Sequence, residues 1–278
     1  MSTYELIDCK HGRFLYNTND QYVGASLVRY GEWSEHEVEL FAKILRPGDH
    51  VIEAGSNIGS HTVPISRLVG ETGLVHSFEP MRYTQQLLSA NLALNECFNV
   101  LGHRAAVGRE SASIQFPLPD PRQPANFGAM SVLNRNGHRT EQVQQIALDA
   151  LELERLDFIK ADIEEYEFEL LVGARQTIAK FRPVVYLEFG PNKDELVAYF
   201  DALDYSCYYF ISPMFNPKNF RGETVDHFQA SSADLLCVPN ERSAVSGLTS
   251  ASVGDGRVSW TATGIVYATL PWSGAEFS

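Results

Sequence analysis

Short apolar runs alternate with amphipathic segments through the middle of the chain. The apolar runs have the length of strands, and they occupy residues 50–55, 73–79, 99–107, 157–163 and 183–189. The intervening segments carry apolar residues at helical spacing, over residues 59–69, 82–95, 167–179 and 193–203. A final pair of strands is expected at 207–211 and 235–238. Because strands alternate with helices, we predict an α/β fold with a mostly parallel sheet and helices on both faces.

The two ends of the chain follow a different pattern. Residues 11–30 alternate polar and apolar positions around a turn-rich cluster, which predicts a β-hairpin. Ser34 and Glu37 then form a capping box, which predicts the start of a helix. We expect three parts, which are an N-terminal hairpin and helix extension over 1–48, an α/β domain over 49–240 and a C-terminal tail over 241–278.

Two segments interrupt the alternation. Residues 116–140 are rich in Pro, Asn, Gly and Arg and are too long for a simple connection, so we expect a surface excursion. Such a loop can cover a site or be inert, and the sequence leaves both options open. In the tail, residues 258–270 alternate enough to form an edge strand, with disorder as the alternative.

Composition and charge narrow the class of protein. Of the 278 residues, 44% are hydrophobic and 21% are charged, which is typical of a globular domain. The formal net charge of −13 argues against a nucleic-acid partner, because phosphate binding needs clustered Lys and Arg. The N-terminus lacks a secretory signal, and no apolar segment is long enough to cross a bilayer. We therefore expect a cytoplasmic protein with neither nucleic acid nor membrane as a partner.

The four cysteines are scattered and form no C-x-x-C pair. They are Cys9, Cys97, Cys207 and Cys237. This spacing predicts neither a zinc site nor a disulfide framework.

The segment from residue 50 to residue 62 is the most informative part of the chain. It has the pattern of a buried strand, a turn with Gly55 and Gly59, and the start of a helix, which is how α/β proteins hold an adenosine-containing cofactor. A dinucleotide site would need glycine where this chain has Asn57 and Ser60. The pattern therefore disfavours a nicotinamide-dependent oxidoreductase.

Two acidic residues indicate which kind of adenosine-containing cofactor would bind. Glu53 ends the first strand, where it could hold an ammonium group, and Glu79 ends the second, where it could accept hydrogen bonds from a ribose diol. An amino acid attached to a nucleoside carries both groups. S-adenosylmethionine is such a molecule.

Acids also end two later strands, Asp162 and Glu188. Ligands of a parallel sheet bind at the carboxyl ends of the strands, so these carboxylates should converge with those of Glu53 and Glu79. They would repel one another unless a cation or hydroxyl groups lie between them. We assign no metal ligands, although a metal between Asp162 and Glu188 is an open alternative. Lys160 lies on the same strand face as Asp162, which should pair the two side chains.

A family resemblance joins these features. The chain resembles FkbM-type methyltransferases, which are class I S-adenosylmethionine-dependent enzymes, from about residue 11 to residue 240. The resemblance rests on the order and spacing of motifs at residues 30–35, 53–59, 78–80, 91–95, 105–108, 160–164 with Glu167, 171–174, 182–183 and 215–220. Family members commonly have Asp in place of Glu53 and Gly in place of Glu165.

The resemblance implies a Rossmann-like sheet of seven strands whose last strand is antiparallel. It also implies S-adenosylmethionine as cofactor, with S-adenosylhomocysteine as the product. The cofactor-binding residues would be Glu32, Ser34, Glu53, Gly55, Ser56, Asn57, Gly59, Glu79, Pro80, Arg104, Ala105 and Asp162. Glu32 would close over the cofactor from the N-terminal extension.

The sequence says less about the methyl acceptor than about the cofactor. Methyl transfer to a hydroxyl group needs a base, and the candidates are Asp162, Glu164, Glu167, Glu188 and His61. We expect O-methylation of a small molecule, a sugar or a natural-product intermediate. The alternatives are an N-methyltransferase of the same fold and an inactive cofactor-binding or interaction domain, and a homodimer is an open option. Four aromatic residues could line the acceptor pocket or belong to the core, namely Trp33, Phe127, Phe215 and Phe220.

Overall fold

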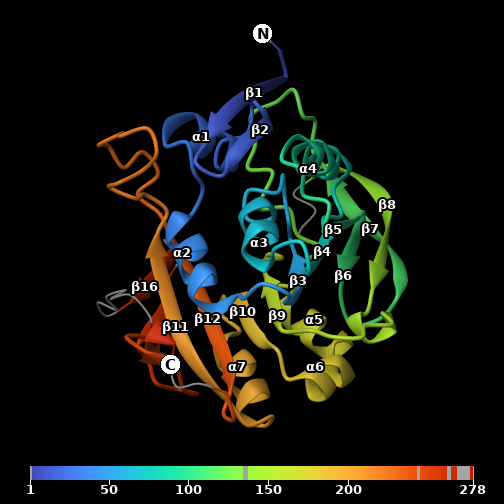
Figure 1. Cartoon of the computed structure of the whole chain (residues 1–278), viewed down its shortest axis with the longest axis vertical. Helices are drawn as coiled ribbons and strands as arrows, with labels where there is room; N and C mark the ends of the chain where they lie inside the picture. The colour runs from blue at the N-terminus through green and yellow to red at the C-terminus, as the bar shows by residue number, and fades with distance from the viewer. Residues whose placement is uncertain (1, 134–136, 243–244, 262–263, 268–275, 278) are drawn as a thin grey trace.

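The computed structural model is built on a central sheet of eight strands in the order β14-β11-β12-β10-β9-β3-β4-β5 (Figure 1). It describes residues 2–133, 137–242, 245–261, 264–267 and 276–277. The strands of this sheet are β3 (His50–Ala54), β4 (Leu74–Phe78), β5 (Val100–His103), β9 (Phe158–Ala161), β10 (Val184–Glu188), β11 (Tyr205–Pro213), β12 (Ser231–Pro239) and β14 (Thr249–Ser250).

Most of this sheet is parallel, as predicted. The five strands from β10 to β5 pair in parallel, whereas β12 is antiparallel to both β10 and β11. Seven strands were expected, and the eighth is the two-residue β14, which pairs with Tyr208 and Tyr209 of β11. The added strand covers part of the edge that β11 would otherwise expose.

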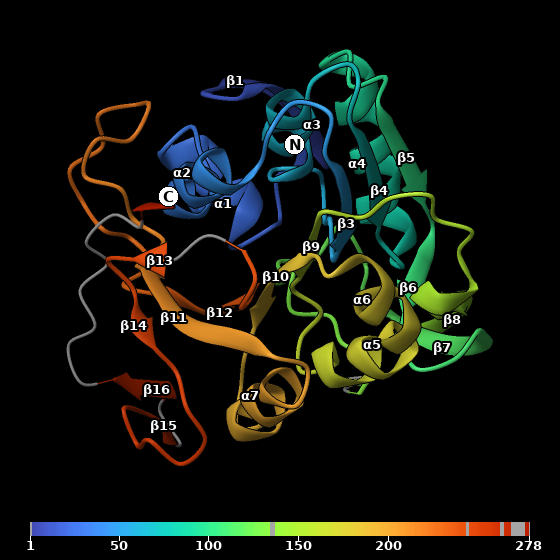
Figure 2. The same cartoon turned by 60° about the horizontal axis from the view of Figure 1, so that its bottom comes forward.

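Helices cover both faces of the sheet. On one face lie α2 (Glu35–Ile44) and α3 (Thr62–Val69), with α4 (Arg82–Leu94) packed beside α3. On the other lie α5 (Glu167–Gly173), α6 (Arg175–Phe181) and α7 (Lys193–Asp201) (Figure 2). Alternate residues of each strand point to opposite faces of the sheet and belong to two separate cores. Val51 and Phe158 pack under α2 and α3. Ile52 and Ile159 belong to the core under α5 to α7. The single helix predicted at 167–179 is interrupted at Ala174.

The N-terminal extension contains the predicted hairpin at a different position. The strands are β1 (Tyr4–Cys9) and β2 (Gly12–Asn17), and they turn just before Gly12, whose φ of 118° favours glycine. The polar cluster near Asp20, which was expected to be the hairpin turn, instead begins α1 (Val23–Arg29). The Asp20 carboxylate accepts hydrogen bonds from the backbone N–H groups of Tyr22 and Gly24, at 3.1 and 2.9 Å.

The strand predicted at 99–107 divides at Arg104. Its second half, β6 (Ala105–Val107), leaves the central sheet and joins β7 (Ala112–Leu118) and β8 (Arg139–Ile146) in a separate three-stranded sheet, which is followed by the 3-10 helix η1 (Leu148–Ala150). The excursion between β7 and β8 packs against the N-terminal extension, where Asn17 donates a hydrogen bond to the Pro121 carbonyl. Phe127 of this excursion is buried. The described part of the excursion is therefore packed against the rest of the protein.

The C-terminal tail adds small sheets at the edge of the domain (Figure 2). They pair β13 (Val245–Ser246) with β17 (Glu276–Phe277), and β15 (Val258–Thr261) with β16 (Gly264–Tyr267). Within the predicted edge strand at 258–270, β15 pairs antiparallel with β16, and residues 262–263 and 268–270 lie outside the described residues. Among the described helices, none has the length and apolar composition that a bilayer-spanning helix requires.

Candidate active site

A cavity of about 260 Å³ lies at the carboxyl ends of β3, β4, β9 and β10. The N-terminal extension contributes Tyr22, Val23, Trp33 and Ser34 to its wall, and the β7–β8 excursion contributes residues 126–128. Both segments that lie outside the alternating core therefore contribute to the wall of the cavity.

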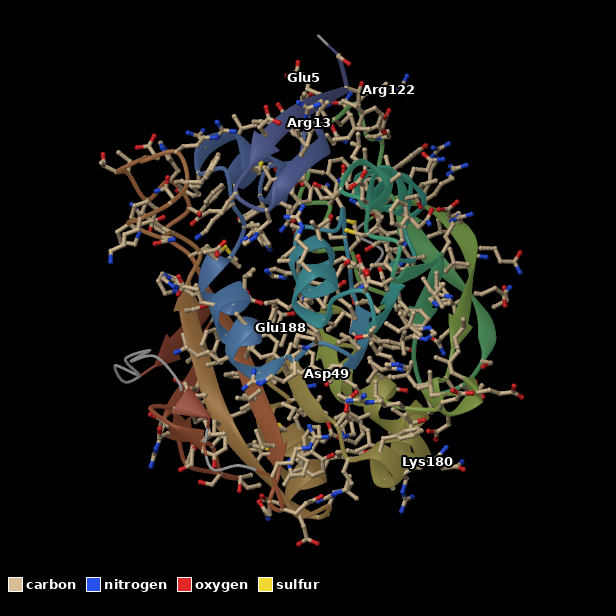
Figure 3. The ribbon with its side chains drawn as sticks, viewed as in Figure 1. Glu5, Arg13, Asp49, Arg122, Lys180 and Glu188 are labelled. Atoms are coloured by element: carbon tan, nitrogen blue, oxygen red, sulfur yellow. The ribbon has the colours of Figure 1, made fainter. Side chains whose placement is uncertain are left out.

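Most of the predicted site residues line this cavity. They are Ser34, Glu53, Gly55, Ser56, Asn57, His61, Glu79, Pro80, Ala105, Asp162, Glu164 and Glu188. Figure 3 places Glu188 in the middle of the molecule, whereas Glu5 and Arg13 lie at one end. Residues that are far apart in the sequence thus meet, and most of them lie at or just after the end of a strand.

Four predicted residues lie outside the described lining of the cavity: Glu32, Gly59, Arg104 and the candidate base Glu167. The Arg104 guanidinium forms an ion pair with Glu141 at 2.8 Å, at the side of the second sheet. Gly59 packs against Leu88, where an added Cβ would lie 2.9 Å from a methyl group.

Glu32 is buried and holds two parts of the chain together. Its Oε1 accepts a hydrogen bond from Asn216 Nδ2 at 2.8 Å, and its Oε2 accepts one from the Phe220 backbone at 3.1 Å. Both carboxylate oxygens are therefore engaged by the segment after β11, which runs beside α1 and α2 (Figure 1). Glu32 anchors this segment to the N-terminal extension, away from the cavity wall.

The turn after β3 has a tight geometry. Gly55 has a φ of 83°, and an added Cβ would lie 1.8 Å from the Asp162 carbonyl oxygen. The backbone N–H groups of Gly55 and Ser56 both donate to the Phe78 carbonyl at 3.0 Å. Glycine at position 55 was expected to let a ligand approach, and the structure shows that it lets the loop after β9 approach.

Glu79 is held firmly at the end of β4. Its Oε1 accepts hydrogen bonds from the Met81 backbone and the Thr84 hydroxyl, at 2.9 and 2.7 Å. Its Oε2 accepts one from the Asn57 backbone at 3.0 Å and keeps further capacity to accept. Burial raises the pKa of Glu79 to about 7.

Glu53 is completely buried at the end of β3. Its Oε2 accepts a short hydrogen bond of 2.6 Å from the Thr62 hydroxyl, whereas its Oε1 has no hydrogen-bond partner among the described residues. The Asn57 side-chain oxygen likewise lacks a described partner. Two acceptors that line the cavity thus await a donor, which is what a bound ammonium group would supply.

Lys160 lies at the centre of the acidic residues and is 1% exposed. It sits between Glu53 of β3 and Tyr186 of β10 in the strand register, and its Nζ lies 3.1 Å from Asp162 Oδ2, as predicted. Burial alone would lower the pKa of Lys160, but the charges of Asp162 and of neighbouring glutamates outweigh it and raise this pKa. Lys160 therefore stays charged.

Carboxylates crowd the end of the cavity formed by β9 and β10. Oxygen atoms of Asp162, Glu164 and Glu188 all lie within 4.8 Å of one another, and Asp234 of β12 lies opposite Glu188. Burial, followed by the charge of Asp162, raises the pKa of Glu164 to about 8 and that of Glu188 well above its usual range. Glu167 lies behind this group, where it accepts a hydrogen bond from the Ile163 backbone at 2.8 Å.

His61 is a buried, neutral part of the wall. Burial, together with the positive charge of Lys160, lowers the pKa of His61 well below its usual value. Its ring packs edge-on against Phe41, with the centroids 5.7 Å apart. Its Nε2 has no hydrogen-bond partner in the described part of the chain. A neutral imidazole can accept a proton, but the charged form is disfavoured here.

The sequence missed two acids that line the cavity, Glu37 and Asp234. Glu37 was expected to close a capping box, but Ser34 adopts a left-handed conformation and makes no side-chain cap, so Glu37 points into the cavity. Burial raises the pKa of Glu37 to about 7. The sequence pattern did not indicate Asp234 as a site residue because it lies before the apolar run of an antiparallel strand. The available signal was an acid at the start of an otherwise buried strand, since an antiparallel strand begins where its parallel neighbours end.

Two of the four aromatic residues considered for the acceptor pocket line the cavity, and two lie outside its described lining. Trp33 and Phe127 line the cavity. Phe220 is 54% exposed, and Phe215 packs on Tyr30 with the ring centroids 5.4 Å apart. The described lining includes neither of the last two.

Sequence comparison identifies the family. The model of the "Methyltransferase FkbM domain" matches residues 53–207, which cover more than half of the chain and include Glu53, Glu79, Asp162, Glu164 and Glu188. The chain belongs to the FkbM methyltransferase family. The matched segment is therefore a methyltransferase domain of a family that uses S-adenosylmethionine, as the resemblance implied.

Several solved methyltransferase structures are similar to parts of this chain. The methyltransferase FkbM of Methylobacillus flagellatus is 17% identical, with a TM-score of 0.40 over 72% of this chain and 50% of that one. The chain thus spans about half the length of that protein. A precorrin-6y C5,15-methyltransferase from Geobacter metallireducens is 12% identical, with a TM-score of 0.47 over 73% and 86% of the two chains. The M. jannaschii protein TYW2, solved with AdoMet, is 12% identical, with a TM-score of 0.46 over 85% of each chain. No curated protein matches the sequence.

Proposed function

We propose that this FkbM domain transfers the methyl group of S-adenosylmethionine to a hydroxyl oxygen of a small polar molecule, such as a sugar or a natural-product intermediate. One observation carries the proposal. A single cavity joins the turn after β3 and the buried Glu79 to the carboxylates at the ends of β9 and β10. One end has groups that suit the cofactor, and the other has groups that suit a hydroxyl acceptor.

The cofactor would lie over the turn that contains Gly55. Its ammonium group would complete the hydrogen bonding of Glu53 Oε1 and the Asn57 side-chain oxygen, both of which lack described partners. The ribose hydroxyls would donate to Glu79, which stands at the end of the neighbouring strand. Ala105, at the start of β6, would border the adenine.

The acceptor would occupy the carboxylate-rich end. Its oxygen would attack the methyl carbon as the bond from that carbon to sulfur breaks, so that the sulfonium becomes a neutral thioether. The hydroxyl proton would pass to a carboxylate of the cavity wall. Seven carboxylate side chains line the cavity, namely Glu37, Glu53, Glu79, Asp162, Glu164, Glu188 and Asp234. This surplus of negative charge would repel a carboxylate acceptor and favour a neutral polyol.

The test uses the purified protein with methyl-labelled S-adenosylmethionine and a panel of sugars, phenols, carboxylic acids and amines. We expect label on hydroxyl compounds and none on carboxylic acids. Replacing Glu188 with Gln should lower the transfer rate by about 100-fold while S-adenosylhomocysteine still binds. Glu5→Gln is the matched control, because Glu5 is exposed at the far end of the molecule (Figure 3). Label on amines alone would replace the acceptor assignment with N-methylation, and binding without any transfer would favour an inactive domain.

A further inference from the structure

Three carboxylates at the rim of the central sheet are arranged like ligands around a single ion. Asp162 follows β9, Glu164 lies two residues further on, and Glu188 ends β10. Each offers an oxygen, and these oxygens all lie within 4.8 Å of one another. Metal–oxygen bonds of about 2.0–2.6 Å to Mg²⁺, Mn²⁺ or Ca²⁺ would span that separation.

A fourth carboxylate supplies an independent observation. Asp234 is 3% exposed and lines the same cavity. Its Oδ2 is buried and has no hydrogen-bond partner among the described residues. Because Asp234 lies opposite Glu188 on the neighbouring strand, its side chain stands on the same face of the sheet as that of Glu188. A buried carboxylate oxygen without a donor is costly unless a cation or a donor reaches it.

The protein's own cation does not satisfy this group. Lys160 is the one lysine or arginine among the described residues that line the cavity, and its ion pair is with Asp162. Glu188, Glu164 and Asp234 form no ion pair within the described part of the chain. The carboxyl groups on the β10 and β12 side of the cavity thus have no cationic partner among the described residues.

The backbone turns Glu164 toward this group. Glu164 and Glu165 both have positive φ angles, of 59° and 68°, which are unusual for residues other than glycine. The Glu164 carbonyl accepts a hydrogen bond of 2.7 Å from the Ser131 hydroxyl, which ties the turn to the excursion. A strained backbone turn persists only where neighbouring contacts hold it, and here the hydrogen bond from Ser131 does so. Such a turn fixes the position of the Glu164 side chain.

We infer that Asp162, Glu164 and Glu188 bind one divalent cation with a preference for oxygen ligands, with Asp234 completing the negative surroundings of the ion. All of the ligands are carboxylates, so Mg²⁺ and Mn²⁺ fit better than the softer metals that histidine and cysteine bind. The binding itself does not depend on the acceptor. The role of the ion rests on the proposed function, because it would draw two neighbouring hydroxyl oxygens of the acceptor to the methyl group and ease loss of a proton from one of them.

The test is a titration of the full chain with Mn²⁺, in the presence of S-adenosylhomocysteine, followed by electron paramagnetic resonance and calorimetry. We expect one ion per chain, displaced by Mg²⁺. Glu188→Gln should weaken Mn²⁺ binding by more than tenfold, and Asp234→Asn should weaken it by about tenfold. Both should leave the affinity for S-adenosylhomocysteine within about twofold, because the cofactor end is a separate part of the cavity. Glu5→Gln should bind Mn²⁺ like the unaltered chain.

The outcomes separate the two proposals. Failure of the unaltered chain to bind Mn²⁺, Mg²⁺ or Ca²⁺ at millimolar concentration would overturn the cation site, whatever the methylation assays show. Binding that survives Glu188→Gln unchanged would overturn the ligand assignment. Circular dichroism and binding of S-adenosylhomocysteine establish that each variant is folded. If the cation binds but no hydroxyl compound is methylated, the cation site stands and the acceptor assignment fails.

Discussion

Glu188 and Asp234 lie directly opposite each other on the antiparallel strands β10 and β12. Both line the cavity, and burial raises the pKa of each carboxyl group well above its usual range, with the charge of Asp162 adding to the rise. The pair stands at the point where the parallel part of the sheet meets its antiparallel strand. This junction is where the acidic end of the cavity is built.

Neutralising one member of this pair should stabilise the fold. Asp234→Asn keeps the shape of the side chain and cannot become charged, so at a pH above the raised pKa of Asp234 we expect the free energy of unfolding to rise by about 1 kcal/mol without divalent cations. Urea denaturation measures this change. Asp8→Asn is the control, because Asp8 forms an exposed ion pair whose loss should change stability by less than about 1 kcal/mol. A loss of stability in Asp234→Asn would show that the Asp234 charge is compensated in the folded protein.

Glu53 should decide the affinity for the cofactor. In Glu53→Gln the buried charge that would face the cofactor's ammonium group is lost, while the hydrogen bond with Thr62 can be kept. We expect the affinity for S-adenosylhomocysteine to fall by about 2–3 kcal/mol, measured by calorimetry. Glu5→Gln should bind as the unaltered protein does. Unchanged affinity in Glu53→Gln would place the ammonium group elsewhere.

Glu79 should make the stability of the ligand-free protein depend on pH. Burial raises its pKa from 4.5 to about 7 in the folded state, so the folded protein binds a proton more tightly than the unfolded chain does. This contribution to stability is fully present below about pH 4.5 and is lost as the pH rises through about 7. The difference of about 2.5 pKa units corresponds to about 3 kcal/mol.

Comparison of the unaltered protein with Glu79→Gln isolates this contribution. Urea denaturation at pH 5 and pH 8 should show a smaller loss of stability with rising pH in the variant. Equal pH dependence of the two proteins would mean that Glu79 keeps its ordinary pKa in the fold. The other carboxyl groups with raised pKa values contribute equally to the pH dependence of stability in both proteins.

The hydrogen bond between Glu32 and Asn216 should hold the segment after β11 in place. In Asn216→Ala, the buried Glu32 Oε1 loses its donor, which should lower the free energy of unfolding by about 1–3 kcal/mol. Limited proteolysis should also cut residues 216–228 faster. Lys218→Ala is a nearby control, since Lys218 is exposed. Equal stability of the two variants would show that the segment is held by its other contacts.

Part of the site followed from sequence order. A parallel sheet ends all of its strands at one edge, so the acids that end four apolar runs were expected to meet there, and Glu53, Glu79, Asp162 and Glu188 do line one cavity. The pairing of Lys160 with Asp162 followed from the two-residue period of a strand. Such predictions hold because they depend only on local geometry and strand direction.

Other features depended on the packing of distant segments. Asp234 reaches the cavity because β12 runs antiparallel. Glu37 does so because α2 packs on the face of the sheet formed by β9 and β10, where Phe41 contacts Phe158 and Tyr186. Glu32 turns to Asn216, 184 residues away, and Arg104 turns to Glu141. A polar side chain has several partners of similar energy, and only the assembled fold decides which one is within reach.

The alternating pattern by itself determined the α/β sheet and the edge at which its acids gather, because burial and strand period are properties of neighbouring residues. Tertiary structure alone decided which of those acids face one another and which polar oxygens, such as Glu53 Oε1 and Asp234 Oδ2, are left without a described partner. The reason is that hydrogen bonding and desolvation depend on atoms brought together from the whole chain.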